Sequence, residues 1–211
     1  PNELRTGQPY QGFPELSLQI KWYEIPPWLA GTWRSKDMRV LHKVDYLTGA
    51  YYTIPTVEVD TDVQSFGDLS DLDKGIWHAM ISPEIVSYQK QNLVDARDTI
   101  GIKMLECSAE RVLIWKRQFH IIYNPDGNQI VSSFTEERVD EFGPTSSGRL
   151  IGQSYTRLYD SNGDLQMAAT MLRTYAIDKQ YQQRYERAGV ELINSLSSHL
   201  QYIGRHDLIN W

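Results

Sequence analysis

Eight stretches of this chain have the length and residue pattern of β-strands, and turn-forming residues separate them. Two of the joins, Asn124–Asn128 and Asp160–Asp164, place Gly or Asn where a tight turn needs a positive φ. Successive antiparallel strands of this length must close or stack, because an open sheet leaves long unpaired edges. We therefore expect a mainly β fold, an antiparallel barrel or a strongly curved sheet. The predicted strands are Thr32–Val44, Tyr51–Val59, Gly75–Ile81, Thr99–Ser108, Val112–Tyr123, Gln129–Val139, Leu150–Tyr159 and Leu165–Ile177.

The segments before and between these strands are less regular. Residues 1–28 hold five of the nine prolines and predict an extended arm, with a short strand at Leu16–Ile20. Phe66–Gly75 is rich in Asp and Gly, which is typical of an acidic surface loop. A Ser-Pro pair that resembles a helix start precedes 84–96, so this segment is open between a helix and a strand.

The last part of the chain has a helical period. After Asp178, apolar residues recur at steps of three and four, which places them on one helical face. This pattern predicts one amphipathic helix over about 179–203 that packs against the sheet, so that 29–211 forms a single domain. The residues on this face are Tyr181, Tyr185, Ala188, Leu192, Leu196, Leu200 and Ile203.

Composition limits the class of partner and the compartment. A net charge of −6 without a basic stripe excludes a nucleic-acid surface, and no apolar run reaches the length of a transmembrane segment. The single Cys107 rules out an internal disulfide. The chain starts at Pro1 without Met, which a processed precursor or a trimmed chain explains equally well. We expect an exported protein of a periplasm or lumen and leave the cytoplasm open.

The chain carries no motif that predicts catalysis, a cofactor or a metal. Its five histidines share no ligand spacing, and the calcium-like turn Asp160–Asp164 has Met171 where the bidentate Glu would stand. We therefore expect no catalytic residue, no cofactor and no metal site. An enzyme that uses the protein interior as a chamber stays open, with Tyr155 and Arg157 as an admissible pair on one strand face.

Gly31 and Trp33 form a Gly-x-Trp directly before the first long strand, and sequential hairpins and a closing helix follow. This arrangement resembles the lipocalin-like (calycin) superfamily. The resemblance implies that Trp33 seals the base of a barrel and that an Arg of the last strand, here Arg173, packs across its ring. These three residues would be structural, since a guanidinium stacks well on an indole face.

The alternation of residues along three strands predicts the lining of the interior. If the more apolar faces point inward, the interior receives aromatic and Met side chains together with one arginine from each strand, Arg117, Arg157 and Arg173. A buried Arg needs a carboxylate or a ligand anion, so we expect a small apolar or amphipathic ligand whose acidic group, where present, meets a guanidinium. The alternative is that Arg117 and Arg157 lie near strand ends, where they reach water or pair with Glu136 or Glu137. The predicted ligand-binding residues are Trp115, Arg117, Phe119, Tyr155, Arg157, Met167 and Met171.

The arm offers a second kind of site. Trp22, Tyr23 and Trp28 are large apolar residues in an irregular segment, and such residues often anchor a protein partner. The competing interpretation is that the arm folds back over the base of the sheet. Two functions follow: a ligand-binding protein, or a structural or accessory subunit of an envelope or lumenal assembly that uses the arm and loops as its interaction surface.

Overall fold

The computed structural model describes residues 5–209 and is mainly antiparallel β-structure with one C-terminal α-helix. The strands are β1 (Gln19–Ile25), β2 (Gly31–Asp45), β3 (Tyr51–Tyr52), β4 (Thr56–Phe66), β5 (Leu69–Ser70), β6 (Ile76–Ser82), β7 (Ile85–Lys90), β8 (Leu93–Cys107), β9 (Val112–Asn124), β10 (Gln129–Pro144), β11 (Leu150–Tyr159), β12 (Leu165–Lys179), β13 (Glu186–Arg187) and β14 (Val190–Glu191). The helices are α1 (Leu192–Tyr202) and a short 3-10 turn, η1 (His206–Leu208).

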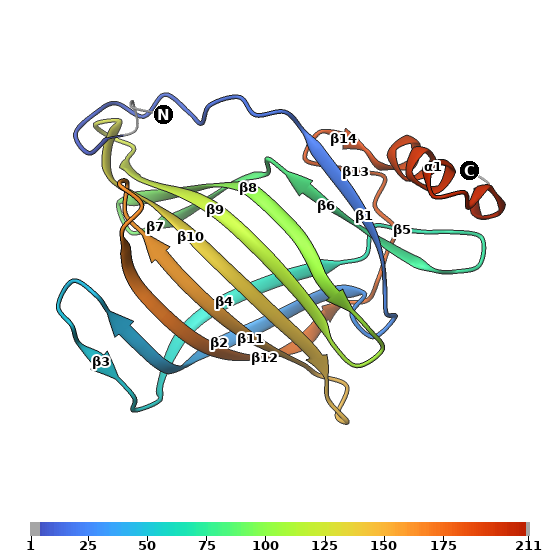
Figure 1. Cartoon of the computed structure of the whole chain (residues 1–211), viewed down its shortest axis with the longest axis horizontal. Helices are drawn as coiled ribbons and strands as arrows, with labels where there is room; N and C mark the ends of the chain where they lie inside the picture. Colours follow the sequence, from blue (N-terminus) through green and yellow to red (C-terminus); the bar gives the residue numbers. More distant parts are fainter. Residues whose placement is uncertain (1–4, 210–211) are drawn as a thin grey trace.

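The large sheet has nine strands in the order β3-β2-β12-β11-β10-β9-β8-β7, and β4 also pairs with β2 (Figure 1). Within residues 5–209, no ladder joins β4 to β7, so the sheet does not close into a barrel. The inner faces of distant strands nevertheless meet. The ring of Phe66 on β4 lies 5.1 Å from the ring of Phe142 on β10.

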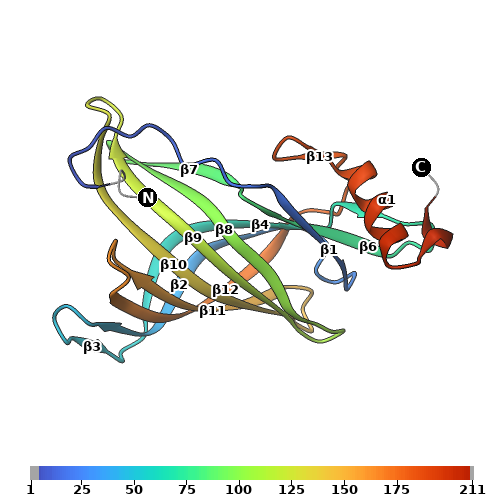
Figure 2. The same cartoon turned by 45° about the horizontal axis from the view of Figure 1, so that its top comes forward.

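Two hydrophobic cores follow from this arrangement. The first occupies part of the space inside the large sheet and contains Trp33, Phe66 and Phe142. The second lies between the small sheet β1-β6-β5 and the helix α1, and it contains Trp22 and the helix residues Leu192, Leu196 and Leu200. Figure 2 shows this small sheet and α1 together to one side of the large sheet.

Several predicted elements need adjustment. Residues 84–96 are neither one helix nor one strand: β7 and the start of β8 form a hairpin, with Gln91 at a φ of 58° in the turn. The predicted strand Tyr51–Val59 is divided into β3 and β4, with Pro55 between them. Proline has no backbone N–H to donate to a ladder, which explains the break. In the arm, Gln19–Ile25 is a strand that pairs with β6.

The helix prediction was wrong over its first half. Strand β12 runs on to Lys179, residues 186–191 form the short hairpin β13–β14, and helix α1 starts only at Leu192. Tertiary contacts overrode the helical period here. The ring of Tyr181 lies against Gly67, and Arg184 and Arg187 are both held by ion pairs to the buried Asp68.

The Gly-x-Trp segment has a structural role. Gly31 has a φ of 132°, and a Cβ at this position would lie 2.9 Å from Ile177 Cδ1. Trp33 is buried and donates its indole N–H to the carbonyl oxygen of Leu29 at 2.8 Å. The implied packing of Arg173 over this indole is not realised. The Arg173 guanidinium instead forms an ion pair with Asp60 on β4 and donates to the Asp60 carbonyl at 2.7 Å.

Candidate functional site

A polar cavity of about 390 Å³ lies inside the large sheet, at the side where the sheet does not close. One part of its wall is apolar and includes Phe66, Met80 and Ile114. Strands β4 and β7, the two strands that no ladder joins, both contribute to the lining. The remaining wall is polar or charged, and its side chains include Asp62, Gln64, His78, Glu84, Arg97, Thr99, Lys116, Gln118, Arg138, Asp140, Arg184 and Arg187.

Lys116 is the unusual group in this wall. It lies on β9, directly opposite Arg138 on β10. In the described part of the chain, no carboxylate oxygen lies within the 4.0 Å that defines an ion pair with its ammonium group. Burial lowers the pKa of Lys116 and the positive charge of Arg138 lowers it further, while the more distant charges of Asp140, Asp62 and Glu136 oppose this shift. The cavity therefore contains a lysine whose charge is not balanced at close range.

The other cavity cations are paired. Arg138 lies 2.9 Å from an oxygen of Asp140 and 3.5 Å from an oxygen of Glu136. Burial opposes the charge of Arg138, but these carboxylates outweigh it and raise its pKa. Arg97 lies 2.7 Å from Asp95 and covers the ring of Tyr88 at 4.4 Å.

Asp62, a carboxylate elsewhere in the cavity wall, is also engaged by hydrogen bonds within the protein. Asp62 accepts hydrogen bonds from the amide of Gln64, at 2.9 and 3.1 Å, and from the hydroxyl of Tyr175 at 2.7 Å. Burial would raise the pKa of Asp62, but these donors lower it overall, while burial and the nearby Asp62 raise the pKa of Tyr175. Asp62 thus stays ionised and acts on Lys116 through its charge, but it forms no ion pair with it at close range.

A second charged cluster holds the C-terminal segment against the cavity. Asp68 is fully buried, accepts the Ala79 N–H at 2.8 Å, and lies 2.7 Å from Arg184 and 3.2 Å from Arg187. His78 Nδ1 is 3.0 Å from Asp68, and Arg187 also reaches Glu84 at 3.3 Å. The predicted acidic surface loop is therefore wrong over its first half, where Phe66, Asp68, Leu69 and Asp71 are buried. The burial of the Asp68 carboxylate is matched by two guanidinium groups.

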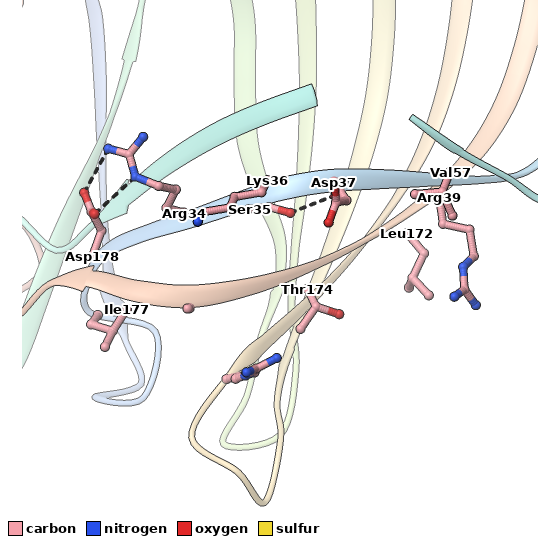
Figure 3. Close-up of a pocket in the computed structure, with 12 residues that line it drawn as sticks. Arg34, Ser35, Lys36, Asp37, Arg39, Val57, Leu172, Thr174, Ile177 and Asp178 are labelled. Atoms are coloured by element: carbon pink, nitrogen blue, oxygen red, sulfur yellow. Dashed lines mark hydrogen bonds and ion pairs between the residues drawn. The ribbon is translucent and has the colours of Figure 1, made fainter. Parts of the chain in front are cut away.

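A second hollow of about 530 Å³ lies on the outside of the sheet (Figure 3). It forms where the ladder between β2 and β12 is interrupted between the pairs Leu172–Arg39 and Ala176–Arg34. Arg34 is neutralised there by Asp178, with two contacts of 3.1 Å. Figure 3 shows Arg39 at the other end of this hollow, away from that ion pair. The charged side chains that line this hollow are exposed.

The predicted ligand residues do not line one interior. In the ladders, Arg117 and Arg157 flank Glu137, on the opposite face from Lys116 and Arg138. Arg117 lies 3.7 Å from Glu137, which is the alternative pairing considered from the sequence. Trp115, Tyr155 and Arg157 do line a shared hollow of about 400 Å³, but it is on the outer face. Met167 and Met171 lie on the inner face with Arg173.

The arm explains why the more apolar face of β9 points outward. Phe119 is covered by Phe13, and the Tyr10 ring stacks on Tyr123 with 4.5 Å between centroids. The prediction that the more apolar face of β9 points into the interior was therefore wrong. That face points outward, where the arm covers it. The cavity-facing residues of β9 are Ile114, Lys116 and Gln118, which alternate with the outer face. This alternation was visible in the sequence, but its polar residues are typical of a face exposed to solvent.

The predicted partner-binding residues are largely engaged within the chain. Trp22 is buried in the second core and donates to Ser195 Oγ at 3.0 Å. Trp28 is half-buried and donates to the Ala109 carbonyl at 2.7 Å, and Tyr23 packs against the first core. This arrangement corresponds to the fold-back alternative.

The geometry defines an antiparallel β protein with a polar internal cavity and one unbalanced lysine. Across residues 5–209, no group of three or more His, Cys, Asp or Glu side chains is arranged to hold a metal ion. The same part of the chain contains no helix with the length and apolar character needed to cross a membrane. Comparison of the chain with protein-family models, curated proteins and solved structures returned no significant match.

Proposed function

We propose that this protein binds a small amphipathic carboxylic acid in the internal cavity of a calycin-like β fold, without catalysing a reaction. The observation that carries the proposal is the ammonium group of Lys116, which lies in the cavity wall without an ion-pair partner in the described residues. Lys116 is half-buried, and a cation that is partly withdrawn from water gains from a nearby anion. A ligand carboxylate would supply that anion.

The remaining wall suits the rest of such a ligand. Phe66, Ile114 and Phe142 offer an apolar surface for a hydrocarbon body. Gln118 lies two residues after Lys116 on the same face of β9, and its amide donates to the hydroxyl of Thr99 on β8 at 3.0 Å. Both side chains line the cavity and offer further polar contacts to the acid. A cavity of about 390 Å³ falls within the range of about 300–1,000 Å³ typical of small-molecule sites.

The test compares a carboxylate with its neutral counterpart. Isothermal titration calorimetry with decanoate and decanol distinguishes recognition of the acid from simple partition of a chain into an apolar space. Lys116→Met is expected to weaken decanoate by about tenfold or more, since a hydrogen bond to a charged group contributes about 1.5–3 kcal/mol. It should leave decanol binding almost unchanged.

Lys103→Met is the matched control. Lys103 is exposed on the outer face of β8, with its ammonium 5.5 Å from the ring centre of Trp115. This variant removes the same charge from the protein but not from the cavity, so decanoate should bind as it does to the wild type. Equal weakening by both variants, or equal affinity for acid and alcohol, would contradict the role given to Lys116.

Native mass spectrometry of protein purified from its own host complements the titration. A stoichiometric extra mass that disappears on denaturation would identify the natural ligand. A clean mass of the chain alone would favour the alternative of an accessory subunit, which acts through its surface.

A further inference from the structure

Asp98 is a buried carboxylate on the outer face of the large sheet. It lies on β8, directly opposite Phe119 on β9, and is only 1 % exposed. Within residues 5–209, its Oδ1 has no hydrogen-bond partner, and no cation lies within the 4.0 Å that defines an ion pair with this carboxylate. A buried carboxylate without a partner is unfavourable when it is ionised.

The N-terminal arm covers this part of the outer face. Phe13 packs against Phe119, the ladder partner of Asp98, and the Tyr10 ring stacks on Tyr123 further along β9. Burial raises the pKa of the Tyr10 hydroxyl, and the charges of Tyr123 and Asp98 raise it further. Asp98 therefore lies beneath the arm and within electrostatic reach of it.

The main-chain contacts that hold the arm lie near the start of β10. The Gly7 N–H donates to the Ile130 carbonyl at 2.8 Å, and the Ile130 N–H donates to the Gln8 carbonyl at 2.8 Å. A third bond of 2.9 Å runs from the Tyr10 N–H to the Asn128 carbonyl. The arm residues that make these bonds are exposed or only half-buried. A segment with exposed hydrogen bonds and few buried apolar contacts opens at a small cost in free energy.

The surroundings of Asp98 do not offset its negative charge. The arm, β7 and β9 pack against it, and its ladder neighbours on the two strands, Ile85 and Phe119, are apolar. The titratable or charged side chains on the same surfaces are Tyr10 on the arm and Arg117 and Tyr123 on β9. Arg117 is directed to Glu137 at 3.7 Å. Burial alone accounts for the raised pKa of Asp98.

We infer that arm residues 6–13 form a strap that lies closed over β8 and β9 when Asp98 is protonated and loosens when Asp98 is ionised. Loosening returns the carboxylate to water and uncovers Phe119. Because Asp98 has the higher pKa in the closed state, closure is favoured at low pH and is lost as the pH rises through that raised pKa. The strap lies outside the sheet and does not depend on an acid bound in the cavity.

The experiment measures amide hydrogen exchange of the full chain between pH 4.5 and pH 8. The observed rates for Gly7, Tyr10 and Ile130 are divided by the intrinsic rates at the same pH. We expect protection of these amides in the wild type to fall by about threefold or more across this range. Asp98→Asn removes the charge with little change of shape, so protection should stay high and independent of pH. Amides of the β10–β11 ladder are the internal reference and should keep their protection.

Asp126→Asn is the matched control. Asp126 is an exposed carboxylate in the turn before β10, close in sequence to the residues that hold the arm. This variant should reproduce the wild-type profile. Protection in the wild type that does not fall with pH, the same fall in Asp98→Asn, or loss of the fall in Asp126→Asn would overturn the inference. A parallel loss of protection in the β10–β11 ladder would show that the sheet opens rather than the strap and would overturn it too.

Discussion

Asp68→Asn offers a direct test of how the C-terminal segment is attached to the β-structure. The Asp68 carboxylate is fully buried between β6 and the segment that follows β12, where it meets Arg184 at 2.7 Å and Arg187 at 3.2 Å. Asn has nearly the same shape but carries no charge. The substitution therefore leaves two guanidinium groups without their main counter-ion while changing the packing very little.

The size of the effect follows from the acidity of this group. Burial would raise the pKa of Asp68, but the contact with His78 and the charges of His78, Arg187 and Arg184 lower it from 3.8 to about 2. That difference corresponds to about 2.5 kcal/mol of stability at neutral pH. Arg187 keeps its contact with Glu84 at 3.3 Å, and the Arg184 side chain is 34 % exposed, which limits the further cost of the unpaired charges. We expect a total loss of about 3 kcal/mol.

The assay is urea unfolding of the wild type and Asp68→Asn between pH 7 and pH 2. Because Asp68 is more acidic in the folded state, its contribution is complete above the unfolded pKa near 4 and is lost as the pH falls towards 2. The difference between the two proteins should therefore be constant near neutral pH and shrink below about pH 4. Asp207→Asn, which removes an exposed ion pair with Arg205, should have no measurable effect. A difference between wild type and Asp68→Asn that is small, or independent of pH, would refute the reasoning.

Three further predictions concern the cavity and the base of the sheet. Lys116→Met should leave the stability of the ligand-free protein unchanged or raise it by up to about 1 kcal/mol in urea unfolding, because it replaces a half-buried cation that has no close counter-ion with an apolar chain. A clear loss of stability would mark Lys116 as structural. Decanoate affinity measured by calorimetry should fall as the pH rises from 7 towards 10. Burial and Arg138 lower the pKa of Lys116, so the folded protein loses this charge at a lower pH than a free lysine does. Lys103→Met should show the same pH profile, and a flat profile in the wild type would argue against a charged Lys116 as the acid's partner. Trp33→Ala should destabilise the protein by roughly 3–5 kcal/mol, because the indole is buried and bonded to Leu29, and a protein with unchanged unfolding would contradict its place in the core.

The positions of the strands were predictable from local pattern. The segments around β2, β6 and β8–β12 show strand residues between turn residues, and the turns at Asn124–Asn128 and Asp160–Asp164 lie where Gly and Asn were expected to place them. These features depend on neighbours within a few residues, so the chain carries them without reference to the rest of the fold. The buried Trp33 was predictable for the same reason.

The lining of the cavity was not predictable in this way. Strand β9 presents Trp115 and Phe119 on one face and Lys116 and Gln118 on the other, and alternation alone does not say which face turns inward. The N-terminal arm determines which face turns inward, because Phe13 packs against Phe119 on the outer face of β9.

The structure of the C-terminal segment was also only partly predictable, because it depends on ion pairs with a distant residue. Its helical period was genuine only from Leu192 onward, where Leu192, Leu196 and Leu200 pack against the small sheet. Before that point, Arg184 and Arg187 are drawn to Asp68, more than a hundred residues earlier in the chain. Local periodicity reports what a segment can form alone, whereas the burial of a charge depends on partners that only the folded chain brings together.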